Sequence, residues 1–452
     1  MHAPGVARPD NGRYSYPPES HHPPLQTGWM ATSDRIPARP GMTLWRNAAQ
    51  LGTAKVLSSV LGLLWTVVLA RSLGLSEFGE YTYLVALTVL LSLFAEGGFA
   101  NIVIRDVASD PGALDRTVPT AMALTLALNL AACLAAIGIA VLDQPTTGRF
   151  WSATLAAAYI PANGLFNMIS AVFRGHNRFD YDSTFNLIYF LLFAVLSGVA
   201  LLLGWGAVGV IGAHVVRMYL VLAASAAVCM MRVGRLRIAF VPERARYLFK
   251  EGLPLVLSGA AAQVYVRIDI VVLSFVAGTN AVALYSVAAR FTDALTTAAN
   301  VLGFASLPVL AEMWRDDPRR AHQFTQATVG RALLLTLLAA AGGAIIARPL
   351  IRHLYGLPFG VSGQILQILL AAVPLSAASQ ILSALVIASS RQRALVWIFG
   401  GAAVLSTFLN FLLAARWQYF GSAASNVATA TFVAVTLWWL VQRLEKERIA
   451  RA

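Results

Sequence analysis

The chain has 452 residues, of which 58% are hydrophobic and only 12% are charged. A water-soluble domain carries about 25% charged residues, so this composition excludes an ordinary soluble protein. The net charge of +13 does not indicate a nucleic-acid-binding protein, because the basic residues lie in short gaps between apolar runs rather than on one face of a soluble fold.

Residues 1–46 differ in composition from everything after them. They contain eight prolines by Pro40, together with Gly, Ser and the pair His21-His22, and they have no apolar core. Such a stretch is not a signal peptide, which needs a hydrophobic region after a basic start. We expect a disordered cytoplasmic tail, in which the His pair is too isolated to form a metal site.

The rest of the chain consists of apolar runs long enough to cross a membrane. About 20 apolar residues are needed to cross roughly 30 Å of hydrocarbon. Twelve runs meet this requirement, at about 47–69, 80–104, 117–142, 151–173, 183–203, 206–231, 252–277, 283–310, 326–347, 363–389, 394–415 and 420–441. Two joins are very short, Gly204-Trp205-Gly206 and Gly278-Thr279-Asn280, and we expect tight turns there. The sequence therefore predicts an all-α membrane protein with about 12 transmembrane helices.

The positions of Lys and Arg predict the orientation. Most of the 34 basic residues lie in the N-terminal tail, in every second loop after it, and in the C-terminal segment. The opposite loops hold only Arg71, Arg149, Arg348, Arg352 and Arg416. Because cytoplasmic loops are enriched in Lys and Arg, we expect both termini to be cytoplasmic, in a bacterial inner membrane.

Several classes of function lack their sequence signatures. The outward loops are short, so there is no external domain to hold the catalytic residues of a glycan polymerase or ligase. No G-x-x-x-x-G-K-[ST] phosphate loop is present, which excludes ATP as the direct energy source. Cys133 and Cys229 lie within apolar runs and suggest neither a disulfide nor a metal site. We expect no cofactor and no enzymatic activity.

The spans divide into two equal halves. The most basic loop between spans, 232–251, separates an N-lobe at 47–231 from a C-lobe at 252–441, and 442–452 forms a basic cytoplasmic tail. A shift of 204 residues places Gly74 on Gly278 and Tyr81 on Tyr285. Two six-helix lobes of the same orientation imply a pseudo-two-fold axis along the membrane normal, with a substrate cleft between them. Within the linker, Pro242 to Lys250 predicts a short interfacial helix.

A set of motifs in these positions resembles a known family. The first hairpin has Leu69-Ala70-Arg71-Ser72-Leu73-Gly74, Phe78-Gly79, Tyr81, Gly97-Gly98 and Arg105-Asp106, and later matches are Phe173-Arg174-Gly175, Pro254, Arg267-Ile268-Asp269, Tyr285 to Arg290, Leu354-Tyr355-Gly356, Asn410 and Gly421 to Ala424. Together they resemble the polysaccharide-exporting flippases of the multidrug/oligosaccharidyl-lipid/polysaccharide exporter superfamily. The resemblance implies a two-lobed, alternating-access transporter. It further implies a glycan linked to polyprenyl diphosphate as the substrate, moved from the cytoplasmic to the outer leaflet.

Ionisable residues inside the spans are the candidate site. They are costly in hydrocarbon and therefore mark a pathway. Folding each hairpin about its turn places Lys55 level with Glu96, Arg267 with Asp293, and Asp269 with Arg290, whereas Arg217, one turn after His214, has no level partner. These groups form ion pairs that lock each hairpin, or they line the cleft. In the second case Lys55, Arg217, Arg267 and Arg290 bind the diphosphate, and Glu96, Asp269 and Asp293 take up a coupling H⁺ or Na⁺.

The function predicted from the sequence is a flippase for a lipid-linked oligosaccharide in cell-surface polysaccharide biosynthesis. Its partners would be the polyprenyl-diphosphate glycan, membrane lipid and the other export proteins, such as a polymerase, and not a nucleic acid. Two alternatives stay open. One is a cation-coupled small-molecule exporter of the multidrug and toxin extrusion type, which favours an acid-rich aromatic pocket. The other is a membrane enzyme of glycan assembly, against which the short external loops count.

Overall fold

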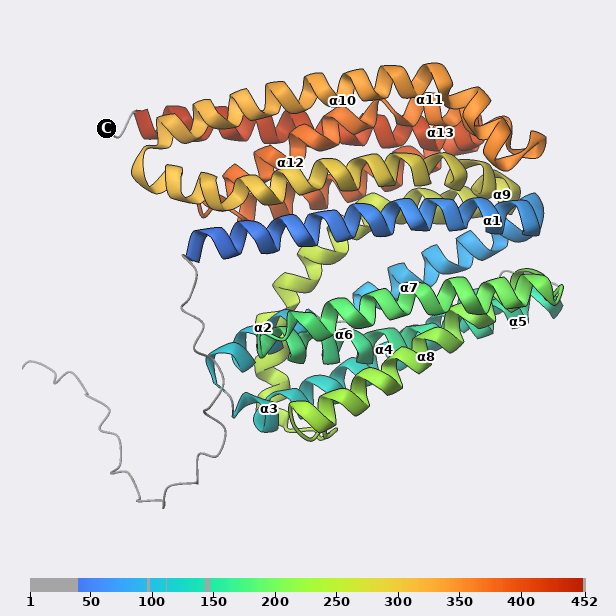
Figure 1. Cartoon of the computed structure of the whole chain (residues 1–452), viewed down its shortest axis with the longest axis horizontal. Coiled ribbons are helices and arrows are strands. Elements are labelled where there is room, and N and C mark those ends of the chain that lie inside the picture. The colour runs from blue at the N-terminus through green and yellow to red at the C-terminus, as the bar shows by residue number, and fades with distance from the viewer. Residues whose placement is uncertain (1–39, 96–97, 111, 143–146, 450–452) are drawn as a thin grey trace, which may run out of the picture. The chain divides into compact units, whose positions relative to one another are not determined.

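A computed structural model describes residues 40–95, 98–110, 112–142 and 147–449 (Figure 1). The chain divides into a unit at Met1–Leu44 and a compact unit at Trp45–Ala452, and the account below concerns the second. Throughout the described ranges the regular structure is helical. The predicted disordered tail at 1–46 lies mostly outside these ranges, although the first helix already begins at Pro40.

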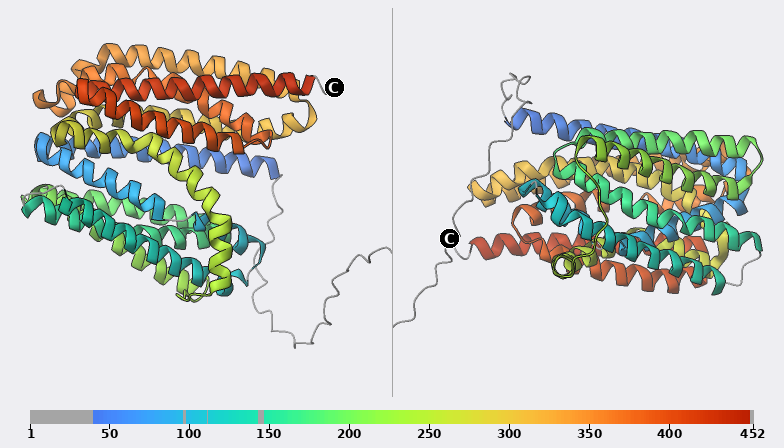
Figure 2. Two further views of the ribbon diagram at one scale, coloured as in Figure 1. Left: turned by 180° about the vertical axis from the view of Figure 1, so that it is seen from behind. Right: turned by 90° about the horizontal axis from the view of Figure 1, so that it is seen from below.

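The helices follow one another with short connections (Figure 1). In the first half they are α1 (Pro40–Ala95), α2 (Phe99–Ser109), α3 (Ala113–Arg116), α4 (Val118–Leu142), α5 (Thr147–Ala157), α6 (Tyr159–Gly175), α7 (Phe179–Leu202) and α8 (Gly206–Arg232). In the second half they are α9 (Pro242–Asp316), α10 (Pro318–Tyr355), the 3-10 turn η1 (Leu357–Phe359), α11 (Ser362–Leu369), α12 (Ala372–Ala388) and α13 (Arg393–Ile449). Figures 1 and 2 show α10 to α13 gathered together and α4 to α8 gathered together, with α1 between them.

Eight helical stretches are long and apolar enough to cross a membrane, or nine if the bent pair Leu357–Leu369 and Ala372–Ala388 forms one span; the search covers the described residues only. Three of the eight contain a non-helical residue, namely Gly74, Gly278 and Gln418. Each lies where the sequence predicts a turn between two spans. Gly74 and Gly278 have φ of 71° and 79°, a left-handed conformation that favours glycine. The count of twelve spans in two lobes stays a prediction.

The predicted short helix in the linker is only partly correct. A helix does begin with Pro242 in its first turn, but it does not end near Lys250 and continues as α9. Ala245 and Leu248 are buried against the first half of the chain, which fixes this segment in place. Figure 2 shows that the early part of α9 runs across its neighbours before the helix turns along them.

The buried apolar residues form three large clusters. The first draws from both halves, from Leu69 to Ile211 and from Ile270 to Ala423, and it includes residues flanking the Gly74 and Gly278 turns. The second extends from Phe99 to Leu248, and the third from Leu310 to Val441. The halves therefore share the first core, near the Gly74 and Gly278 turns, and the start of α9 also packs into the second core, which otherwise belongs to the first half. Cys133 and Cys229 are both free.

Candidate functional site

Arg267 and Asp293 lie on the two arms of α9, on either side of the turn at Gly278. The Arg267 Nη1 atom donates to Asp293 Oδ2 at 3.1 Å, and the two side chains are 30% and 38% exposed. Arg267 lies 11 residues before Gly278 and Asp293 lies 15 residues after it, so the two lie at similar depth on the two arms and their side chains meet. This predicted pair is confirmed.

Asp269 has a different partner from the predicted one. Its carboxylate accepts a hydrogen bond from the Tyr285 hydroxyl and another, at 2.8 Å, from the backbone N–H of Ile270. No ion pair joins Asp269 to Arg290 in the described chain, so that pairing is wrong. The long Tyr285 side chain reaches the carboxylate from the opposite arm, and a carboxylate that accepts two such hydrogen bonds needs no cation.

Arg290 is half-buried, and the described residues offer it neither an ion pair nor a hydrogen bond. Its guanidinium acts electrostatically on the hydroxyls of Tyr81, in α1, and Tyr355, at the end of α10. These two tyrosines belong to the core that both halves share. Arg290 is therefore a cation placed where the halves meet.

A cavity of about 290 Å³ lies beside the charged residues of the second half. Arg267, Asp269, Tyr285 and Asp293 all line it. Its remaining polar lining consists of hydroxyl and amide side chains, namely Thr292, Thr296, Thr297, Ser376, Ser379, Gln380 and Asn426. Arg267, Asp269 and Asp293 therefore line a polar cavity.

Arg217 occupies a separate site in the first half. It is 5% exposed, and its Nη2 atom lies 2.8 Å from the Tyr189 hydroxyl and 2.8 Å from His214 Nδ1. The guanidinium carbon lies 3.8 Å from the Tyr189 ring centre and 4.1 Å from that of Phe193, two cation–π contacts. No described carboxylate pairs with Arg217, which agrees with its lack of a level partner in the sequence.

Tyr189 and Tyr285 complete these two sites. The sequence identified Tyr285 as a motif residue without a role in the site, and it did not identify Tyr189. A tyrosine in the middle of an apolar span is itself a signal, because a buried hydroxyl needs a hydrogen-bond partner. For the third predicted pair, Lys55 and Glu96, the Lys55 side chain and all of Glu96 lie outside the described residues.

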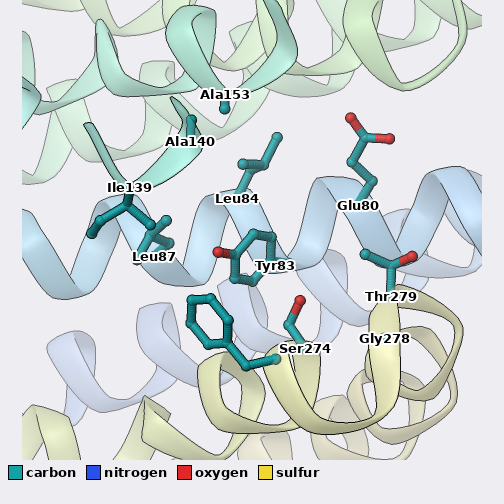
Figure 3. Close-up of a pocket in the computed structure, with 11 residues that line it drawn as sticks. Glu80, Tyr83, Leu84, Leu87, Ile139, Ala140, Ala153, Ser274, Gly278 and Thr279 are labelled. Atoms are coloured by element: carbon teal, nitrogen blue, oxygen red, sulfur yellow. The ribbon is translucent and has the colours of Figure 1, made fainter. Parts of the chain in front are cut away.

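A second cavity, of about 150 Å³, lies between the two halves (Figure 3). It is lined by Glu80, Tyr83, Leu84 and Leu87 of α1, Ile139 and Ala140 of α4, Ala153 of α5, and Ser274, Phe275, Gly278 and Thr279 of α9. In Figure 3 the Glu80 carboxylate points away from Thr279. None of the predicted site residues lines this cavity.

The halves touch directly near the Gly74 and Gly278 turns. A Cβ atom at Gly79 would lie 2.0 Å from the Thr279 carbonyl oxygen, so only glycine permits this approach. Nearby, Phe78 packs edge-on against Phe359 with ring centres 6.2 Å apart, and Arg71 Nη2 donates to the His353 carbonyl at 2.6 Å. This end carries the loops that are poor in basic residues.

Near the start of α9, polar side chains hold this helix to α2. Arg105 donates to the Tyr247 hydroxyl at 2.6 Å and to Glu251 at 3.4 Å, and Tyr247 donates to both Asp106 oxygens at 3.1 Å. Burial and the adjacent Asp106 carboxylate raise the pKa of Tyr247, which keeps the hydroxyl protonated. This contact ties the linker to the first half.

Comparisons with solved structures show that other chains share this fold. A structure titled lipid II flippase MurJ, in the inward closed conformation, superposes with a TM-score of 0.74 at 14% identity, covering 88% of this chain and 87% of that one. An inward-facing multidrug resistance MATE family transporter of the MOP superfamily gives 0.65 at 17% identity, covering 87% and 96%. At such identities the likeness concerns the fold alone.

The sequence comparisons are more specific. The curated protein "Probable flippase AglR" from Haloferax volcanii is 25% identical over 282 residues, which are 60% of this chain and 56% of that protein. The chain thus aligns with a little over half the length of that relative. The family described as "Polysaccharide biosynthesis protein" matches residues 44–314, more than half of the chain. This multi-pass membrane protein therefore belongs to the family of polysaccharide biosynthesis proteins.

Proposed function

We propose that this protein is a transporter, and not an enzyme, that flips an oligosaccharide linked to polyprenyl diphosphate from the cytoplasmic to the outer leaflet. The product would serve cell-surface polysaccharide biosynthesis, together with a polymerase and other export proteins. Membership of the polysaccharide biosynthesis family, the relative named as a probable flippase and the fold shared with a lipid II flippase support this function.

The observation that carries the proposal is that Arg290, within the span region, has no described ion-pair partner. A guanidinium within the span region is stable only beside a counter-charge or water. Arg290 has no counter-charge among the described residues, and its neighbours Ala289 and Phe291 pack against the core that both halves share. A diphosphate supplies the missing charge and matches the forked geometry of the guanidinium. Arg267, in the polar cavity, would join it by exchanging Asp293 for the lipid headgroup.

The packing of the halves supports alternating access. The core around the Gly74 and Gly278 turns lies at the end with few basic residues, which we assign to the outer face. At the basic end, which we assign to the cytoplasm, the described contact is that of the start of α9 with the first half. We therefore propose that this is the inward-facing state of the transporter, in a bacterial inner membrane with both termini in the cytoplasm. The headgroup would enter between the halves while the polyprenyl chain remains in lipid.

The test is Arg290→Ala, assayed in vesicles by the leaflet position of a polyprenyl diphosphate carrying one fluorescent sugar. A hydrogen bond to a charged group contributes about 1.5–3 kcal/mol, so flipping should fall by about ten- to a hundredfold. Insertion and thermal stability should stay close to those of the unmodified chain, because Arg290 holds no described partner. Arg315→Ala, at a side chain that is 81% exposed, is the matched control. Normal flipping by Arg290→Ala would remove the assigned role.

A cation-coupled multidrug exporter is the second candidate, favoured by one observation. The cavity of the second half holds two carboxylates, Asp269 and Asp293, together with Tyr265 and Phe399. An acid-rich aromatic pocket suits an organic cation. Resistance to cationic dyes on expression, lost in Asp269→Asn, would favour this candidate over the flippase.

A further inference from the structure

His214 is neutral in this structure, as its contact with Arg217 dictates. The Arg217 Nη2 atom lies 2.8 Å from His214 Nδ1. A guanidinium only donates hydrogen bonds, so Nδ1 must accept and carries no proton. His214 is 7% exposed, and its Nε2 atom has no hydrogen-bond partner.

The groups around His214 would not compensate a positive charge on its ring in addition to that of Arg217. The ionisable groups around His214 are Arg217 on its own helix, Tyr189 from α7 and Tyr159 from α6. The ring centres of Tyr159 and His214 lie 4.5 Å apart. The Phe193 ring packs edge-on against His214, with ring centres 5.8 Å apart. In the described chain no carboxylate pairs with Arg217. A proton on Nδ1 would therefore place two buried cations 2.8 Å apart. A protonated His214 and this position of Arg217 exclude each other.

Tyr81 connects this site to the region between the halves. Its ring stacks on Phe193 with centres 6.4 Å apart, and both Arg217 and Arg290 act electrostatically on its hydroxyl. Arg217 belongs to the first half and Arg290 to the second. The position of Arg217, and with it the proton on His214, is thus linked to the contact between the halves.

We infer that His214 is the proton-coupling site of the transporter, which rests on the proposed function. The proton leaves Nδ1 for cytoplasmic water as the inward-facing state forms, and an Arg217 N–H then donates to the vacated lone pair. In the outward-facing state Arg217 withdraws and Nδ1 binds a proton from outside. No other bond changes. One proton moves inward for each lipid moved outward, the direction that a proton gradient favours.

The experiment uses the full chain in vesicles with the fluorescent-sugar polyprenyl diphosphate, at a membrane potential clamped to zero. One face is held at about pH 5.5 and the other at about pH 7.5, on either side of the ordinary histidine range. One-for-one exchange across two pH units permits about a hundredfold accumulation of the lipid in the leaflet facing the acid side. In His214→Gln, whose amide oxygen still accepts from Arg217 but does not titrate, the accumulation ratio should fall to about one. His353→Gln, at an exposed side chain, is the matched control.

The ratio is independent of the absolute rate, so a partly impaired variant remains informative. Gradient-driven accumulation by His214→Gln would overturn the inference. If His214→Gln does not insert into the membrane, a pH-sensitive dye inside the vesicles measures proton entry with the unmodified chain. Lipid flipping without proton entry would also overturn the inference. A chain that flips no labelled lipid under any condition contradicts the proposed function itself. A chain that flips the lipid but ignores the gradient contradicts only the role of His214.

Discussion

Each described charge of the candidate site is stabilised in its own way. Arg267 pairs with Asp293, and Asp269 accepts hydrogen bonds from Tyr285 and a backbone amide. Arg217 rests between aromatic rings. Arg290 alone among these five lacks a hydrogen-bonded partner in the described chain. The most available cation is thus the one that lies between the halves.

The Arg267–Asp293 pair should show measurable coupling in a double-mutant cycle. Arg267→Ala and Asp293→Ala each leave a charge unpaired beside the cavity, so each should lower the free energy of unfolding, and the double variant should lose less than their sum. For side chains about one-third exposed we expect a coupling on the order of 1 kcal/mol, measured by denaturation in detergent. Arg315 and Asp316, 3.5 Å apart but 81% and 66% exposed, should show almost none. Strict additivity at Arg267 and Asp293 would contradict the pairing.

At the scale of elements, the glycines of the first hairpin have two distinct tasks. Gly74 reverses the chain with a positive φ, as Gly278 does in α9. Gly79 instead allows the first hairpin to pack on the second, with the Thr279 carbonyl where a side chain would otherwise lie. The 204-residue shift that aligns Gly74 with Gly278 also aligns Gly79 with Ala283, whose Cβ lies 3.3 Å from the ideal Gly79 Cβ. Equivalent hairpins of the two halves therefore form this contact.

Gly79→Val should open the contact, since its Cβ cannot be placed without moving backbone. We would introduce Val282→Cys, at a position fully buried in the shared core, into a chain without Cys133 and Cys229. A membrane-impermeant thiol reagent on the side of the Gly278 turn should label it at least about tenfold faster in the Gly79→Val chain, because separating the hairpins exposes buried surface. Gly62→Val, where nothing lies within 4 Å of the added Cβ, serves as the control. Equal labelling of both variants would show that this contact does not close the end.

At the scale of the whole compact unit, the two halves share a core and a hydrogen bond at the end of the Gly74 and Gly278 turns. Arg71 reaches the free carbonyls at the C-terminus of α10, where the helix dipole favours a cation. The alternating access that we propose requires this contact and the shared core around it to separate once in each cycle. Closure at this end should therefore be reversible.

A cleavable cross-link tests that requirement. Arg71→Cys with His353→Cys, joined by a bifunctional thiol reagent carrying an internal disulfide, should stop lipid flipping, because the halves would be unable to part. Reduction should restore the rate. Treatment of the Arg71→Cys single variant controls for modification alone. Continued flipping by the cross-linked chain would exclude separation at this end.

The sequence determined those features that depend on local geometry. Apolar run length predicts membrane-spanning helices, and glycine marks the turns at Gly74 and Gly278, because both follow from what a short segment can do by itself. The same reasoning correctly paired Arg267 with Asp293, since depth along a hairpin is set by distance from its turn. The family resemblance was likewise legible in the order of short motifs, and the family match confirms it.

The tertiary structure decided which way each side chain points and which distant helix receives it. Depth alone placed Asp269 level with Arg290, but direction around the helix axis places the Asp269 carboxylate against the Tyr285 hydroxyl, and no described ion pair joins it to Arg290. The contact of Arg217 with Tyr189, and that of Gly79 with Thr279, join segments far apart in the chain. Such contacts depend on how helices rotate and pack against one another, which no periodicity within a single helix specifies.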